Sequence, residues 1–144
     1  MGLCRKVLVF MFAAFVCAAA STGPGLSLAS ELNAPAKLTV STHAVDDWFV
    51  SGTLTNEASK KIVAYRVGWA VATGKVVKFS EGPWMNLPAG IKAGESVLVP
   101  AQNVQPQMQA TQVVFFVSQV KFSDGSKWKA DRKKTLKSAG VPLR

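Results

Sequence analysis

The sequence has very few of the side chains that catalyse reactions or bind transition metals. It contains one histidine and two cysteines, and both cysteines, Cys4 and Cys17, lie near the N-terminus. Nucleophilic catalysis, general-base catalysis and transition-metal binding depend mainly on His, Cys and clustered carboxylates. We therefore expect a protein that is not an enzyme, with no catalytic residues, no metal site and no cofactor.

Acidic residues are also scarce. There are 8 Asp and Glu against 17 Lys and Arg, which gives a formal net charge of +9 at pH 7. This balance excludes an acidic disordered protein and an acidic metal-binding protein. A chain of 144 residues, 49% of them hydrophobic, has room for one domain.

The N-terminal region has the pattern of a secretory signal peptide. Arg5 and Lys6 precede an apolar run over residues 7–20. The run is shorter than the roughly 20 residues that a membrane-spanning helix needs. We therefore assign residues 1–29 to a signal peptide and expect export to the periplasm or the extracellular space.

Two positions fit the small residues that precede signal-peptide cleavage. One follows Ala20 and the other follows Ala29. We favour Ala29, because Gly23 and Pro24 would end the signal helix a few residues upstream. Either cut removes both cysteines, so the exported domain would be stabilised by packing and not by disulfides.

After a linker at residues 30–36, short runs of alternating polar and apolar residues are separated by Gly, Pro, Asn and Asp, which is typical of β-strands. The expected strands are residues 37–42, 47–55, 61–72, 75–80, 96–101, 111–122 and 126–130, with a loop over residues 81–95. Seven short strands without a helix predict an all-β protein, a seven-stranded immunoglobulin-like sandwich over residues 37–130.

Two of these strands carry further information. The run at 111–122 is apolar on both faces, so we expect a central strand that is covered on both sides. The strand at 61–72 has one bulky face and one small face, the latter including Ala64, Gly68 and Ala70. We expect the small face to be open to solvent or to a protein partner.

Several short motifs resemble a known family. They are VSGTLTN at 50–56, SKKIVAY at 59–65, GKVV at 74–77, LPAG at 87–90 and AGES at 93–96. Together they resemble the FxLYD-type bacterial immunoglobulin-like domains, which are exported modules, over about residues 38–130. The resemblance implies an immunoglobulin-like fold and no catalytic residues. We expect Asn56 and Gly74 to occupy turns with left-handed backbone.

One cluster has acid–base potential. His43 is followed closely by Asp46 and Asp47, and a carboxylate can orient an imidazole. The cluster lacks a recognisable nucleophile and oxyanion stabiliser. We therefore interpret it as a solvated loop.

Candidate binding residues fall into two groups. Trp84 and Met85, together with Arg66, are candidates for contact with another envelope protein, although a tryptophan and methionine in such a position more often cap the end of the sandwich. The second group lies near the C-terminus, where residues 121–144 hold eight cations and two anions. The candidates for polyanion binding are Lys127, Lys129, Arg132, Lys133, Lys134 and Lys137.

The sequence thus predicts an exported, non-catalytic module with a protein-binding or structural role in the cell envelope. The alternative is an envelope polyanion or anionic-lipid binder that acts through a short basic tail at residues 131–144. A solvated charged face is the simpler interpretation of the same run. Nucleic acid is the poorest candidate ligand, because export removes the protein from it.

Overall fold

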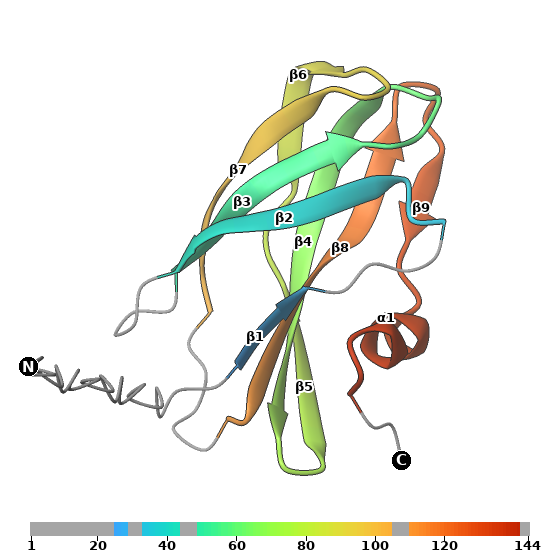
Figure 1. Cartoon of the computed structure of the whole chain (residues 1–144). Helices are drawn as coiled ribbons and strands as arrows, with labels where there is room; N and C mark the ends of the chain where they lie inside the picture. The colour runs from blue at the N-terminus through green and yellow to red at the C-terminus, as the bar shows by residue number, and fades with distance from the viewer. Residues whose placement is uncertain (1–24, 29–32, 44–48, 105–109, 142–144) are drawn as a thin grey trace, which may run out of the picture.

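The computed structural model describes residues 25–28, 33–43, 49–104 and 110–141 of the 144-residue chain. The strands are β1 (Gly25–Leu28), β2 (Ala36–His43), β3 (Phe49–Asn56), β4 (Ile62–Thr73), β5 (Val76–Glu81), β6 (Met85–Ile91), β7 (Ser96–Asn103), β8 (Gln112–Phe122) and β9 (Lys127–Lys129). One helix, α1 (Arg132–Ser138), follows β9 (Figure 1). No helix within these described ranges is long and apolar enough to span a membrane.

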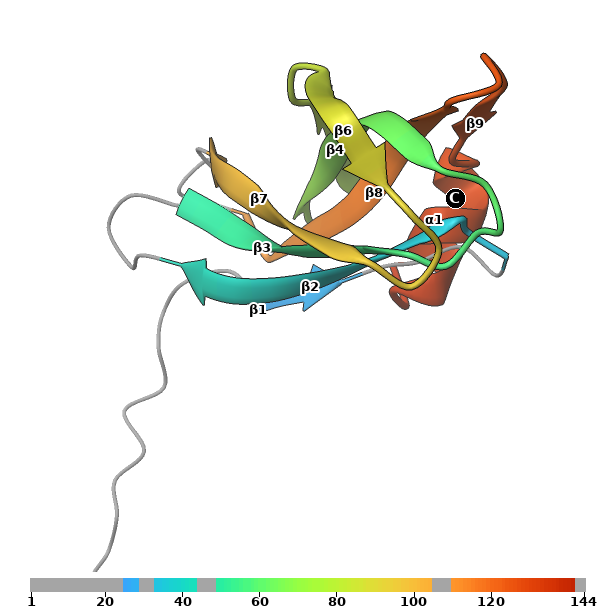
Figure 2. The same cartoon turned by 90° about the horizontal axis from the view of Figure 1, so that it is seen from above.

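The strands form two sheets that pack face to face, as Figure 2 shows from above. The larger sheet has the order β1-β8-β4-β5, with β6 also paired to β4 and β9 also paired to β8. The smaller sheet has the order β2-β3-β7. All pairs are antiparallel except β1 with β8. The expectation of an all-β sandwich is confirmed at this level.

The main core lies between the two sheets. Its largest fully buried side chains are Leu54, Ile62, Tyr65, Val67, Val104, Val113, Phe115 and Val120. Trp69 packs against this core and stacks on Phe115, with ring centroids 5.8 Å apart. Tyr65 and Val67 of β4, and Val113 and Phe115 of β8, are alternate residues that face the smaller sheet. Ile62 and Val120 are out of step with this alternation but belong to the same core, and the pairing of β4 with β8 has register shifts between Ile62 and Ala64 and between Arg66 and Val67.

A second core lies on the opposite face of the larger sheet. Val114 and Phe116 of β8 belong to it, whereas their neighbours Val113 and Phe115 belong to the main core. Leu136 of α1 is buried in the second core together with Val141 and Ala70. The expected central strand covered on both faces is thus confirmed, and α1 provides the second cover.

Residues 131–141 correct the expectation of a basic tail with little to bury. The Asp131 side chain caps α1 by accepting hydrogen bonds from the amides of Lys133 and Lys134. At the other end Gly140 has a φ of 72°, and the Val141 amide donates to the Leu136 carbonyl at 3.0 Å. This is a Schellman ending, in which the last apolar residue packs back on the helix.

The small face of β4 is covered, which corrects the expectation that it is open to a partner. Ala64, Gly68 and Ala70 are all buried. A Cβ at Gly68 would lie 2.9 Å from the Phe116 ring and 3.0 Å from the Ser118 Cβ. Gly68 therefore lets the Phe116 ring lie directly over the backbone of β4, as part of the second core.

Two strands lie outside the expected ranges. β6 occupies part of the expected loop at 81–95, and β1 lies upstream of the expected domain. The structure thus has nine strands in the part of the chain that it describes, more than the seven expected. Pro88 and Gly90 suggested a loop, but β6 pairs only with β4, and a strand with a free edge tolerates a missing amide hydrogen.

Asn56 differs from its expected role. Among the described residues Asn33 is the one non-glycine with positive φ, so Asn56 is not left-handed, whereas Gly74 is, with a φ of 60°. The Asn56 side chain is fully buried at the end of β3. Its amide donates to the carbonyls of Lys60 (2.8 Å) and Ile91 (2.9 Å), and its oxygen accepts from the Ala58 amide (2.9 Å). The Asn56 side chain thus joins the loop between β3 and β4 to the end of β6.

Candidate functional site

Cations from three strands lie on the outer face of the larger sheet, away from the smaller sheet. Arg66 of β4 is the register partner of Gln119 in β8, which is in turn the partner of Lys129 in β9. In the adjacent row Ala64 pairs with Lys121, and Lys121 pairs with Lys127. Cross-strand partners project from the same face of a sheet. We call Arg66, Lys121, Lys127 and Lys129 the basic platform.

Burial of the intervening residues places this platform on the outside. Tyr65, Val120 and Trp128 form the row between the two rows of cations. Tyr65 and Val120 belong to the main core, and Trp128 packs against both the main core and the second core. Because successive side chains alternate between the two faces of a strand, their neighbours point away from the main core.

The three lysines of the platform are close together and exposed. Directly opposed residues on antiparallel strands have Cβ atoms about 5 Å apart, which applies to Lys121 and Lys127. Lys127 and Lys129 are two residues apart on β9, or about 7 Å. None of these lysines forms an ion pair with a carboxylate of the described residues. The arrangement therefore concentrates positive charge without internal neutralisation.

Arg66 is held rigidly at one side of the platform. Its Nη1 lies 3.2 Å from Glu81 Oε2, and its Nε donates to the Gly82 carbonyl at 2.9 Å. The guanidinium also lies over the Trp84 ring, 5.8 Å from the centroid. Gln119 donates to the other oxygen of Glu81 at 3.4 Å. The Arg66 side chain is one quarter exposed, so part of its charge still reaches solvent.

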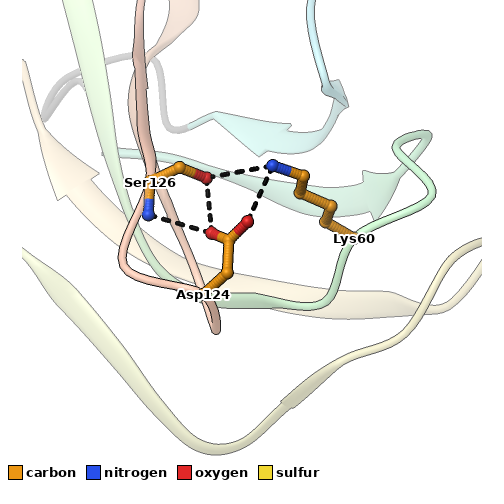
Figure 3. A network of polar contacts seen from close by, with 3 residues as sticks. All are labelled: Lys60, Asp124 and Ser126. Atoms are coloured by element: carbon orange, nitrogen blue, oxygen red, sulfur yellow. Dashed lines mark hydrogen bonds and ion pairs between the residues drawn. The ribbon is translucent and has the colours of Figure 1, made fainter.

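The acidic residue in the turn between β8 and β9 does not neutralise the platform. Asp124 forms an ion pair with Lys60 (2.7 Å) from the loop before β4, and Ser126 donates to the same carboxylate (Figure 3). Hydrogen bonds from Lys60 and Ser126 hold the pKa of Asp124 well below its usual value. Lys60, not a platform lysine, is thus the partner of Asp124.

The α1 cations continue the positive charge beyond β9. β9 and α1 follow each other on the same side of the molecule (Figure 1). The Arg132 guanidinium lies 4.8 Å from the centroid of the Phe79 ring, which packs against the second core. Lys133, Lys134 and Lys137 are exposed on α1. The helix therefore fixes the backbone positions from which these cations extend.

The structure brings most, but not all, of the candidate binding residues to one face. Arg66 and Trp84 are in contact, but Met85 packs against the main core and pairs with Tyr65, so it is not an exposed tip. Lys127 and Lys129 are exposed on either side of the half-buried Trp128. The two candidate groups meet at one face through Gln119.

Lys121 lies in the basic C-terminal region recognised in the sequence but was not among the individual candidates for polyanion binding. The signal was present, because Lys121 lies between Val120 and Phe122, both of which face the main core. The pairing of Lys121 with Lys127, by contrast, depends on the hairpin register.

The candidate acid–base cluster is only partly described. Asp46 and Asp47 lie outside the described residues, and for His43 the structure gives the backbone pairing with Val50. Within the described ranges no group of three His, Cys, Asp or Glu is placed to hold a metal ion.

No family model, no curated protein and no solved structure matches this chain. The resemblance to FxLYD-type domains therefore stays a prediction.

Proposed function

We propose that this protein is a non-catalytic β-sandwich module that binds an anionic polymer of the cell envelope through the basic platform. The observation that carries the proposal is the register of β4, β8 and β9, which gathers Arg66, Lys121, Lys127 and Lys129 on one face. A cluster of cations on one face of a sheet attracts a polymer with repeated phosphate or carboxylate groups. Export and an immunoglobulin-like type of sandwich, both predicted from the sequence, are part of this proposal.

The platform is unfavourable for stability in the free protein, which supports a binding role. Like charges directly opposite each other on paired strands destabilise a sheet. Lys121 and Lys127 form such a pair. Local arrangements that oppose folding are found mainly where function requires them.

The surroundings favour a polymer over a lipid bilayer. The large hydrophobic side chains exposed on the described surface are Val76, in the β4–β5 hairpin, and Leu98, on β7 of the smaller sheet. Neither belongs to the platform, which therefore has no apolar anchor for insertion into lipid.

Support for a protein-binding role is weaker than the sequence suggested. The small face of β4 is buried under Phe116 and near α1. Most described strands with free edges carry residues that disfavour strand addition, for example Lys78 in β5, Pro88 in β6 and Pro100 in β7, and the exception, β1, has only four residues.

The test is binding of the purified protein to heparin and to long-chain polyphosphate at several salt concentrations. We expect binding that weakens as salt rises, because salt screens the charges. The variant K121Q/K127Q/K129Q should lose about tenfold or more in affinity. The control K75Q/K78Q/K92Q removes the same charge from exposed lysines outside the platform and should retain most of the affinity.

Equal loss in the two triple variants would contradict the proposal, because binding would then depend on net charge alone. Vesicles of phosphatidylglycerol and of phosphatidylcholine provide a further comparison. Tighter binding to the anionic vesicles than to either polymer would overturn the choice of a polymer.

The single variant K127E separates binding from stability. A glutamate opposite Lys121 should raise the free energy of unfolding by about 0.2–1 kcal/mol. The same variant should weaken polymer binding. If K127E instead lowered the free energy of unfolding, Lys127 would have a structural role, and repulsion between Lys121 and Lys127 would not destabilise the free protein.

A further inference from the structure

β1 (Gly25–Leu28) forms part of the larger sheet, although it lies within the segment assigned to the signal peptide. It pairs with β8 in parallel, with Gly25 opposite Gln112 and Leu28 opposite Phe115. Figure 1 shows β1 beside the lower part of β8. β4 occupies the other edge of β8 over the same residues.

Cleavage after Ala29 would remove the whole of β1. The mature chain would begin at Ser30. β8 would then have no strand partner at residues 112–115 on that edge, because β9 pairs with β8 only at residues 119–121. Backbone amide and carbonyl groups facing that edge would lose their partners.

An unpaired edge at these residues of β8 would favour aggregation. Val113, Val114 and Phe115 are at most 1% exposed, and they follow one another in the most apolar strand of the chain. An apolar strand with a free edge pairs readily with other chains. Apart from β1, which has only four residues, the described strands with free edges each carry a lysine or a proline, whereas Gln112 to Phe115 include neither.

We infer that β1 is retained in the mature protein, so that the signal peptidase cuts upstream of Gly25, after Ala20, and leaves Ser21 as the first residue. This inference rests on the export included in the proposed function. It replaces the cut after Ala29 that the sequence favoured, and it uses the other position at which small residues allow cleavage.

The test is the intact mass of the protein recovered from a bacterial host that has a periplasm, using the full chain with a C-terminal tag. A periplasmic product that begins at Ser21 is the expected result. A periplasmic product that begins at Ser30 would overturn the inference and leave export and polymer binding intact. An uncleaved chain in the cytoplasm would contradict export itself.

Two variants locate the cut independently. A18Q places a large residue three positions before the expected bond, and we expect uncleaved precursor to accumulate. S27Q does the same for the bond after Ala29 and should leave processing unchanged. The reverse pattern would establish cleavage after Ala29 and refute retention of β1.

Discussion

At the scale of single residues, buried polar side chains determine how the loops are joined to the sandwich. Asn56 is the clearest case, because its side chain forms three hydrogen bonds to the backbone while fully buried. The sequence identified Asn56 as a turn residue but not its interaction with Ile91, which is 35 positions away. Such a contact follows from tertiary packing and not from local propensity.

Replacement of Asn56 by alanine should therefore be strongly destabilising. Two carbonyls and one amide would lose their partners in a buried site, and we expect a loss of about 2–4 kcal/mol in the free energy of unfolding. Urea denaturation measures this loss. N86A, which removes an exposed asparagine of β6, should change stability by less than about 0.5 kcal/mol. Similar small effects of both variants would contradict the assigned role of Asn56.

Tyr65 should make the protein sensitive to alkaline pH. Burial raises the pKa of its hydroxyl above the ordinary value of 10.0, because the charged form is poorly solvated in the main core. A raised pKa in the folded state means that the stabilisation is complete below the unfolded pKa and is lost as pH rises through the folded pKa.

This chain has one tyrosine, so the titration can be followed without ambiguity by tyrosinate absorbance. We expect ionisation of Tyr65 above pH 10 together with falling stability. Y65F should lose this contribution to the pH dependence. Titration of the folded wild type at the pKa of free tyrosine would refute the argument.

At the scale of elements, strands were easier to foresee than the helix. Alternating residues placed seven ranges that each overlap an observed strand. α1 is too short for a helical period to stand out. The residues that begin and end the helix, Asp131 at its N-cap and Gly140 after its last turn, are present in the sequence. The run of cations between them led to the interpretation of a tail.

The helix should contribute to the stability of the whole domain through Leu136. This side chain is 1% exposed in the second core, so L136A should lower the free energy of unfolding by about 2–5 kcal/mol. K137A, one residue later and exposed, provides the control. If L136A unfolded at the same urea concentration as the wild type, α1 would not be packed as described.

At the scale of the whole molecule, the distribution of charge was only partly visible in the sequence. The excess of cations near the C-terminus was evident, and so was Arg66 as a candidate. Their meeting on one face depends on the pairing of β4 with β8 and of β8 with β9. Local patterns such as alternation and turn residues do not reveal the register of strands that are more than 50 residues apart.

The excess positive charge should make folding stability depend on salt. Between about 0.01 M and 0.15 M salt the screening length falls from about 30 Å to 8 Å, which weakens repulsion among the platform and α1 cations. We therefore expect the thermal midpoint to rise with sodium chloride over this range. The variant K121Q/K127Q/K129Q should show a smaller rise. A fall with salt would mean that attractive pairs such as Lys60 with Asp124 outweigh the repulsion.

The close approach of Phe116 to Gly68 has a consequence for how β8 finds its alignment. A strand that is polar on one side cannot slip by one residue without burying its polar groups. Polarity does not prevent such a slip in β8 from Val113 to Val117, because every side chain there is apolar. Gly68 and Phe116 are register partners, and no other residue of β4 lacks a Cβ. A misaligned β8 would bring the Phe116 ring against a larger side chain, so steric fit can select the native pairing where polarity does not.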